Sequence, residues 1–343
     1  MTGAQKKASG CMFGLAYGDA LGKPTEFLNL DAIIRRYGPA GPQNLSGDPA
    51  LVTDDTQMTL AVANALLEAS AESAEQPLTA ERLEPYLRSR YLSWAKSPDN
   101  NRAPGMTCLR AIGRLSENLP WVEATEHNSK GCGANMRVAP LGLIPGLTEP
   151  VRAAAAQFQA ALTHGHATAL AASDLTAFAV YWLADGMQPG DLLTALDDRC
   201  EQQRTVYHAD WLGTLWQRPG VDSPEEFIAR GWDECRAALD SVAAALRTPN
   251  RDVDPCLATG EGWIAEEALA TALHCFLLYP DEPVAMLGRG AATCGDSDSI
   301  ASIAGAFAGA AHGFGVWPAE WAERIEYRTE LNRIGQAWDQ PGS

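Results

Sequence analysis

The sequence predicts an all-α fold, a compact single-domain orthogonal helical bundle, and three observations carry that prediction. Apolar residues recur at helical spacing in several long segments, and two of these segments are rich in alanine. Alternating strand-like stretches are hard to find. Pro, Gly, Asp and Ser gather in short breaks between the segments, as in inter-helix loops. The breaks lie at 70–77, 97–105, 185–190, 217–226 and 248–262.

The first expected helix carries a glycine every four residues, at Gly10, Gly14, Gly18 and Gly22. Positions four apart share one face of a helix, so this stripe permits the close approach of another backbone. Tight helix packing explains the stripe by itself. The stripe would also let the end of the helix, residues 19–26, lie against a buried site.

The later helices are expected for separate reasons. Segment 51–70 has a Thr/Asp start followed by apolar residues at helical spacing. Segments 151–185 and 264–279 are alanine-rich, and segment 293–310 has an apolar stripe behind an acidic start. A C-terminal helix and a short tail are expected over 314–343. No composition shift marks a boundary, so one domain is expected over 1–343.

Composition excludes several classes of protein. The formal charge of −17 over 343 residues argues against direct nucleic-acid binding, which needs clustered Lys and Arg. No run of about 18 apolar residues predicts a membrane span, and "MTGAQKKASG" lacks the apolar core of a signal peptide. A cytoplasmic protein is therefore expected. The eight cysteines form no CxxC and no Cys/His set with zinc spacing, so free and mostly buried thiols are expected.

Two acidic motifs stand at expected helix starts. "VTDDTQM" supplies Thr53, Asp54 and Asp55, and "GDSDSIA" supplies Asp296, Asp298 and Ser299. Each motif alone is also explained as a helix cap, because Ser, Thr and Asp are preferred there. A cap needs one oxygen, however, and each motif offers two carboxylates and a hydroxyl. If the two starts meet, Mg²⁺ or Mn²⁺ would make the cluster tolerable. An EF-hand is excluded, since position six from Asp296 is Ala301 and position twelve is Phe307.

Six motifs in order extend this interpretation: "GLAYGDALGKPTEF", "TDDTQM", "SKGCGANMRVAPLGL", "LTHGH", "GWIAEEAL" and "GDSDSIASIAGAFAGA". In order and spacing the chain resembles the ADP-ribosylglycohydrolase family, which includes the dinitrogenase reductase-activating glycohydrolases. The resemblance runs from about residue 10 to about residue 313. It implies an all-α fold with a binuclear Mg²⁺ or Mn²⁺ site in a cleft, held by Thr53, Asp54, Asp55, Asp296, Asp298 and Ser299. Asp298 is the candidate for bridging both ions.

The resemblance also implies a substrate site. Glu26 matches the family's glutamate beside the metals, although a lone glutamate is usually a solvated surface residue. His164 matches a substrate-binding histidine, and Gly105 and Met106 lie near the adenosine-side loop. The loop "NSKGCG" would line the diphosphate and ribose with Ser129, Lys130, Gly131, Cys132 and Gly133.

Cys132 stands where many members of the family have Asn, so a side-chain contact is expected to be lost there. The remaining polar residues of these motifs are expected to be structural. Arg137 would support the loop, His166 would lie in the core, and Asp19 would hydrogen-bond locally. Packing roles are expected for Trp263, Glu266 and Glu267, with Trp263 able to reach the cleft.

The implied activity is hydrolysis of the bond between ADP-ribose and a protein side chain, most readily arginine. Glu26, Asp55 and Asp298 are the catalytic candidates, and either Glu26 or a metal-bound carboxylate such as Asp55 would take the proton. The partners would be an ADP-ribosylated protein as substrate and ADP-ribose as product. Serine- or small-molecule-linked ADP-ribose, a catalytically silent ADP-ribose binder and a metal-dependent phosphohydrolase stay open as alternatives.

Overall fold

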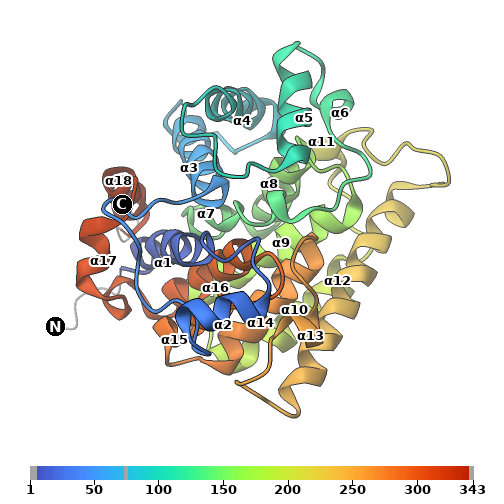
Figure 1. The fold of residues 1–343 in the computed structure, drawn as a ribbon. Coiled ribbons are helices and arrows are strands. Elements are labelled where there is room, and N and C mark those ends of the chain that lie inside the picture. The colour runs from blue at the N-terminus through green and yellow to red at the C-terminus, as the bar shows by residue number, and fades with distance from the viewer. Residues whose placement is uncertain (1–5, 73–75, 340–343) are drawn as a thin grey trace.

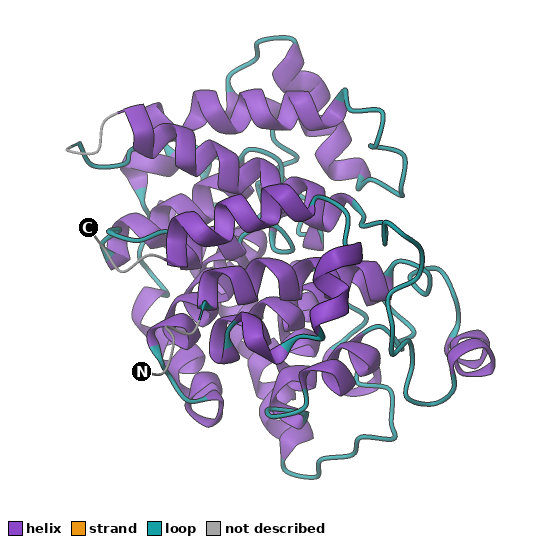
Figure 2. Cartoon of the chain, turned by 90° about the vertical axis from the view of Figure 1, so that its left-hand side faces the viewer, coloured by secondary structure: helices purple, strands orange, loops and turns teal. Residues whose placement is uncertain are grey.

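All regular structure in the described chain is helical. The computed structural model describes residues 6–72 and 76–339, and Figure 2 draws helices and loops but no strand within them. The predicted all-α fold is therefore confirmed. Residues 1–5, 73–75 and 340–343 lie outside the described residues. They include the start of the chain, part of the expected break at 70–77 and the end of the expected tail.

Eighteen α-helices and two 3₁₀ turns make up the described fold. The first part contains α1 (Lys7–Gly22), α2 (Leu30–Tyr37), α3 (Asp54–Glu72), α4 (Ala80–Ala95), α5 (Met106–Ser116), α6 (Trp121–Ala124), η1 (Cys132–Ala134), α7 (Ala139–Leu143) and α8 (Glu149–Ala161). The second part contains α9 (Ala167–Asp185), α10 (Pro189–Gln203), α11 (Ala209–Leu212), α12 (Pro224–Leu246), α13 (Cys256–Thr259), α14 (Ala265–Leu278), α15 (Pro283–Gly290), α16 (Ser297–His312), η2 (Phe314–Val316), α17 (Ala319–Arg324) and α18 (Arg328–Asp339).

The centre of the fold is built from helices that are apolar on nearly every side. All of α1 after its first residue is buried, as is α16 through Ala310, and α9 is buried from Ala167 to Val180. A helix that is apolar all round must be covered on all sides. Accordingly, α16 packs against α1, α9, α14 and α15 (Figure 1). Among the described helices α9 alone is long and apolar enough to cross a membrane, and 83% of its apolar window is buried inside the protein.

The glycine stripe of α1 packs against α16. A Cβ on Gly18 would lie 2.0 Å from the Ala301 carbonyl oxygen, and one on Gly22 would lie 2.3 Å from Asp298 Cα. Further along the contact, Gly14 and Gly10 face two glycines of α16, Gly305 and Gly309. The two backbones are therefore in direct contact, as the four-residue spacing predicts. This contact brings the C-terminal end of α1 against the acidic start of α16.

Two expected segments differ in detail. Segment 151–185 is alanine-rich throughout, yet it forms two helices, α8 and α9, separated by residues 162–166. Thr163 and His164 lie in this break, and their side chains contact each other and Arg137, as described below. His166 is a half-exposed N-cap of α9 and accepts a hydrogen bond from Thr168 N at 3.2 Å, so its expected place in the core is wrong. Over 314–343 the described residues form η2, α17 and α18 instead of one helix.

All eight cysteines are free thiols. Six are buried, whereas Cys132 is partly exposed and Cys294 is exposed. The prediction of free, mostly buried thiols is confirmed, and each of the two exceptions has an aspartate beside it, Asp296 for Cys132 and Asp254 for Cys294.

Candidate metal centre and substrate cleft

Three helix ends that are far apart in the sequence meet in one cleft. They are the turn after α1, the start of α3 and the start of α16. Carboxylate oxygens of Glu26, Asp296 and Asp298 lie within 4.8 Å of one another. Asp54 and Asp55 line the same cleft, which has a volume of about 390 Å³. The two acidic motifs therefore face each other, with Glu26 beside them.

The turn after α1 fixes the place of Glu26. The Thr25 hydroxyl donates to the Gly22 carbonyl oxygen at 2.6 Å, and it also lies 3.1 Å from the hydroxyl of Ser297 in the first turn of α16. Glu26 is half-buried at the cleft wall, so it is not a solvated surface carboxylate. Sequence reasoning missed Thr25, because nothing local shows that its hydroxyl reaches a residue 272 positions away.

Asp19 supports α3 from the neighbouring helix α1. Its carboxylate accepts hydrogen bonds from Thr53 N at 2.9 Å, from Thr56 N at 3.0 Å and from both threonine hydroxyls. The expectation of local hydrogen bonding is therefore wrong, since these partners lie 34 and 37 residues away. Asp19 satisfies donors at the start of α3 that the helix itself cannot satisfy.

Helix-start hydrogen bonds account for only two oxygens of the acidic motifs, Thr53 Oγ1, which accepts from Asp55 N at 3.4 Å, and Asp298 Oδ1, which accepts from Ser299 N at 3.0 Å. The Thr56 N–H is taken by Asp19, not by Asp54 or Asp55. Asp296 occupies the N-cap position of α16 but makes no side-chain capping hydrogen bond. Oδ1 of Asp55 is buried and has no hydrogen-bond partner. A buried carboxylate oxygen without a donor is costly, so these acids require another explanation.

Burial and mutual repulsion make the carboxylates in this cleft poor acids. Burial, then the charges of Asp298 and Asp296, raise the pKa of Glu26 to about 10. Burial also raises the pKa of Asp54 to about 7, with a further contribution from Asp298. The pKa values of Asp55 and Asp296 rise well above the usual range for the same two reasons. Without a cation, these carboxyl groups therefore hold their protons more tightly than free carboxyl groups do.

The residues present fit a divalent cation that prefers oxygen ligands. The cleft wall contains no lysine or arginine among the described residues, so no side-chain cation neutralises the cluster. Carboxylates and hydroxyls are the donors that Mg²⁺ and Mn²⁺ favour. Ser299 lies on the wall, and the buried Thr53 hydroxyl is 2.9 Å from Asp19 Oδ1 and 3.4 Å from Asp55 Oδ2. A bound cation would best explain the buried, unpaired Oδ1 of Asp55.

The glycine loop forms a second wall of the cleft. Gly131, Cys132 and Gly133 all line it, and the two glycines leave room for the His164 ring, which lies 3.5 Å and 3.2 Å from where their Cβ atoms would be. The Cys132 thiol donates to Asp296 Oδ2 at 2.8 Å and so links the loop to the acidic motif, while the expected loss of a substrate contact at this position stays a prediction. The Cys132 N–H donates to the Trp263 carbonyl oxygen at 3.1 Å. That N–H is consequently not free for a phosphate.

Ser129 and Lys130, which belong to the same predicted loop, are not brought into the cleft wall. The Lys130 ammonium forms ion pairs with Glu234, at 2.7 Å, and with Glu266. The Ser129 hydroxyl lies 2.9 Å from the Thr107 hydroxyl. Glu266 has the scaffold role expected of it, and Glu267 accepts from Glu261 N at 3.0 Å.

His164 is almost completely buried, and its ring faces the loop glycines. Its Nδ1 lies 2.8 Å from the Thr163 hydroxyl, which in turn accepts from Arg137 Nη2 at 2.8 Å. Burial, assisted by the Arg137 charge, lowers the pKa of His164 well below its usual range. His164 is therefore a neutral ring at the cleft wall. Arg137 is structural, as expected, but the groups that it holds are Thr163 and Gln159, which follow the glycine loop in the sequence.

The rim of the cleft is formed by loop and aromatic residues. Gly105 N donates to Asp54 Oδ2 at 3.1 Å, which links the predicted adenosine-side loop to the acidic motif, and Met106 is 60% exposed on the wall. Trp263 reaches the cleft and stacks on Phe27 with ring centroids 6.3 Å apart. Phe27 is 70% exposed, and its position after Glu26 was the one signal that could have marked it.

Comparison with known proteins identifies the family. The family model described as ADP-ribosylglycohydrolase matches residues 1–341. The human ADP-ribosylhydrolase ARH3 is 25% identical, with 96% of this chain and 91% of the relative covered. The ADP-ribosyl-[dinitrogen reductase] glycohydrolase of Rhodospirillum rubrum is 26% identical, with 96% and 94% covered. A solved structure titled "ADP-ribosylglycohydrolase-related protein complex" superposes with a TM-score of 0.66, 24% identity and 99% of each chain covered.

The fold and the acidic cleft belong to a class of helical hydrolases. The family match spans nearly the whole chain, and the chain belongs to the ADP-ribosylglycohydrolase family. It is accordingly an enzyme of the ADP-ribosyl glycohydrolase class.

Proposed function

We propose that the protein removes ADP-ribose from modified arginine side chains of proteins, in a reaction that depends on two divalent cations, Mg²⁺ or Mn²⁺. The observation that carries the proposal is the group of five carboxylates, Glu26, Asp54, Asp55, Asp296 and Asp298, around one cleft without a lysine or arginine in its wall. Such a cluster supports cation binding far better than a structural role.

Six residues would hold the cations: Thr53, Asp54, Asp55, Asp296, Asp298 and Ser299. Asp298 is the bridging candidate, because its charge acts on Glu26, Asp54, Asp55 and Asp296. When bound, the cations would supply positive charge for the ribose hydroxyls and for a water nucleophile. They would also offset the negative charge of the protein, −17 in total, toward an anionic diphosphate.

The chain itself would orient the substrate and move the proton. Glu26, on the turn after α1, is placed to hold the proton that a water nucleophile releases, since its carboxylate is half-buried and lies beside Asp298. Asp55 is the rival base, because its Oδ1 has no donor. Neutral His164 and the glycines of the loop would contact the ribose and diphosphate, while Gly105 and Met106 would lie toward the adenosine. The bond that breaks joins ribose C1″ to the acceptor nitrogen, through an oxocarbenium-like transition state.

Arginine is proposed as the acceptor because of the relatives' names. The Serratia proteamaculans relative Tri1, 24% identical over 96% of this chain, is called an ADP-ribosylarginine hydrolase. The chain covers 78% of that relative. The Rhodospirillum rubrum relative acts, by its name, on ADP-ribosyl-dinitrogen reductase. Serine-linked or small-molecule-linked ADP-ribose is the second candidate, because the name of the human relative, ADP-ribosylhydrolase ARH3, specifies no acceptor.

The deciding experiment is product analysis on defined conjugates. Arginine-ADP-ribosylated protein, a serine-linked conjugate and an ADP-ribosylated small guanidine are incubated with the enzyme and Mg²⁺, with and without chelator. Free ADP-ribose should appear from the arginine conjugate, and chelator should abolish it. Asp298→Ala should remove turnover at saturating Mg²⁺ while circular dichroism shows that the protein stays folded.

Three results would replace the proposal. Full turnover by folded Asp298→Ala would exclude the acidic cluster as the catalytic centre. Calorimetry that shows ADP-ribose binding without turnover of any conjugate would identify a silent binder. Release of phosphate in place of ADP-ribose would identify a phosphohydrolase.

A further inference from the structure

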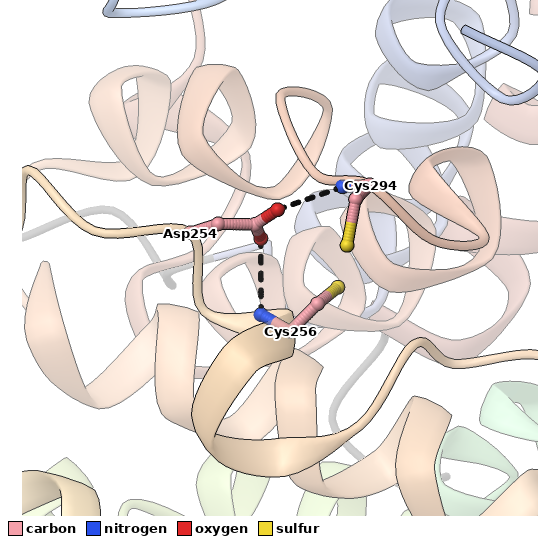
Figure 3. A group of neighbouring side chains, drawn as sticks. All are labelled: Asp254, Cys256 and Cys294. Carbon is pink, nitrogen blue, oxygen red and sulfur yellow. Dashed lines mark hydrogen bonds between the residues drawn. The ribbon is translucent and has the colours of Figure 1, made fainter. Parts of the chain in front are cut away.

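A second cluster of ligating side chains lies outside the cleft, where the loop before α16 meets α13. It consists of Asp254, Cys256 and Cys294, and one ligand atom of each lies within 4.8 Å of the other two. Figure 3 shows the two sulfur atoms turned toward each other, with the Asp254 carboxylate beside them. The sequence shows no zinc-like spacing because Cys294 is 38 positions after Cys256. Only the fold brings them together.

The cluster is held in place by the backbone. Asp254 Oδ1 accepts from Cys256 N at 3.0 Å, and Oδ2 accepts from Cys294 N at 2.9 Å (Figure 3). Each carboxylate oxygen keeps further lone pairs after these bonds. The carboxylate therefore joins the two segments and also presents oxygen ligands next to both sulfurs.

Two of the three residues are buried and one is exposed, which suits a metal site that opens to solvent. Asp254 is 3% exposed and Cys256 is 6% exposed, so two ligands lie in the protein interior. Cys294 is exposed, which leaves a path by which an ion and a water molecule can enter. Three protein ligands with one position open to solvent is a common arrangement around zinc.

We propose that Asp254, Cys256 and Cys294 form a binding site for a thiophilic divalent cation of the zinc type. Two sulfur ligands favour such an ion over Mg²⁺, whereas the all-oxygen cleft has the opposite preference. On binding, the two thiol protons pass to solvent and both sulfurs become ligands as thiolates. The two clusters would therefore hold different metals.

The position of the cluster gives this ion a defined structural effect. Cys294 precedes Asp296 by two residues. The intervening Gly295 packs so closely that a Cβ there would lie 1.9 Å from the Glu261 carbonyl oxygen. Asp296 N donates to that same oxygen at 2.8 Å. An ion bound by Cys256 and Cys294 would therefore link α13 to the loop that carries Asp296. This effect does not depend on the reaction that the cleft performs.

Cobalt titration of the full-length chain tests the site without any measurement of turnover. The protein is reduced, oxygen is excluded, excess Mg²⁺ occupies the oxygen sites, and Co²⁺ is added. One equivalent should bind with a sulfur-to-cobalt charge-transfer band, and Zn²⁺ should displace it. Cys294→Ser should abolish the band or weaken cobalt binding by at least about tenfold, and Cys256→Ser should do the same.

Two variants serve as matched controls. Cys132→Ser tests a thiol on the wall of the acidic cleft, and Cys200→Ser makes the same change at a buried thiol in α10. Both should keep the band. Its absence from the reduced wild-type protein, its persistence in Cys294→Ser, or its loss in Cys132→Ser would overturn the proposal. A Cys256–Cys294 disulfide in the reduced sample would overturn it as well. Because Cys294 is exposed, its variant stays informative even if Cys256→Ser fails to fold.

Discussion

Asp19 and Asp55 lie beside the same helix terminus, the start of α3, and both are buried, yet their surroundings differ. Asp19 accepts hydrogen bonds from two backbone N–H groups and two hydroxyls. Asp55 has one oxygen with no partner at all, and its neighbours are other acids. A buried carboxylate surrounded by donors stabilises the fold. A buried carboxylate surrounded by acids stabilises it only when a cation is present.

The same difference separates the two sides of the cleft region. On the α1 side, donors and close-packed glycines fix the backbone, and nothing there requires a ligand. On the cleft side, acids from three helix ends are brought together by that backbone. Hydrogen-bonded and closely packed residues thus hold the unpaired carboxylates in place, as expected where binding groups are positioned before the ligand arrives.

The largest effect is expected for Asp55→Asn. It removes one charged ligand, so turnover should fall by about a hundred- to a thousandfold, the size typical of losing one group that stabilises a transition state. In the presence of chelator its melting temperature should equal or exceed that of the wild-type protein, because one repelling charge is gone. Steady-state kinetics and calorimetry measure both quantities. A strong loss of stability in chelator would show that Asp55 is structural.

The opposite pattern is expected for Asp19→Asn. Its amide group keeps only one acceptor oxygen, so its NH₂ would face either the Thr53 or the Thr56 N–H with a donor where the wild-type protein has an acceptor. The free energy of unfolding should therefore drop by about 1–3 kcal/mol, with or without cation. Denaturant unfolding measures the loss. A variant of unchanged stability would contradict the supporting role of Asp19 and weaken the contrast with Asp55.

The sequence predicted which acidic residues line the cleft better than it predicted the residues that support them. Thr53 to Asp55 and Asp296 to Ser299 are recognisable because each set is local: adjacent acids at a helix start exceed what capping needs. Glu26 and His164 required the family resemblance, and the structure places both on the cleft wall. Alanine content and apolar spacing predicted α3, α14 and α16, but they did not show the break between α8 and α9.

The hydrogen bonds and ion pairs that the sequence did not predict join segments that are far apart in the chain. The partners of Asp19 lie on another helix, and Lys130 points to Glu234 on α12 instead of the cleft. The contact of Cys132 with Asp296 spans 164 residues. Local patterns carry no information about such pairs, because only the packed helices decide which way a side chain can turn.

A smaller effect concerns the stability of the cation-free protein as a function of pH. Burial raises the pKa of Asp54 to about 7, and burial with neighbouring acids raises the pKa of Glu26 to about 10. The folded protein therefore binds more protons than the unfolded chain above about pH 4, and its stability falls as the pH rises. In chelator, the melting temperature should decrease between about pH 5.5 and 8.

Mg²⁺ displaces those protons, so the melting-temperature gain that it gives should increase over the same pH range. Scanning calorimetry in matched buffers measures the gain, and Asp298→Ala is the control in which it should shrink. A gain that does not depend on pH would mean that the acids of the cleft do not bind the ion.

The smallest effect is expected at the rim, where Trp263 is 41% exposed and stacks on Phe27. Its carbonyl oxygen, which accepts a hydrogen bond from Cys132 N, is unchanged by a side-chain substitution. Trp263→Ala should therefore weaken binding of substrate and transition state alike, by about 1 kcal/mol, which is about a fivefold rise in KM with kcat nearly unchanged. Trp263→Phe, which keeps an aromatic face toward Phe27, should restore most of the affinity. If kcat fell and KM did not rise, Trp263 would contribute to transition-state stabilisation together with the acids. The division between a catalytic centre and a binding rim would then be wrong.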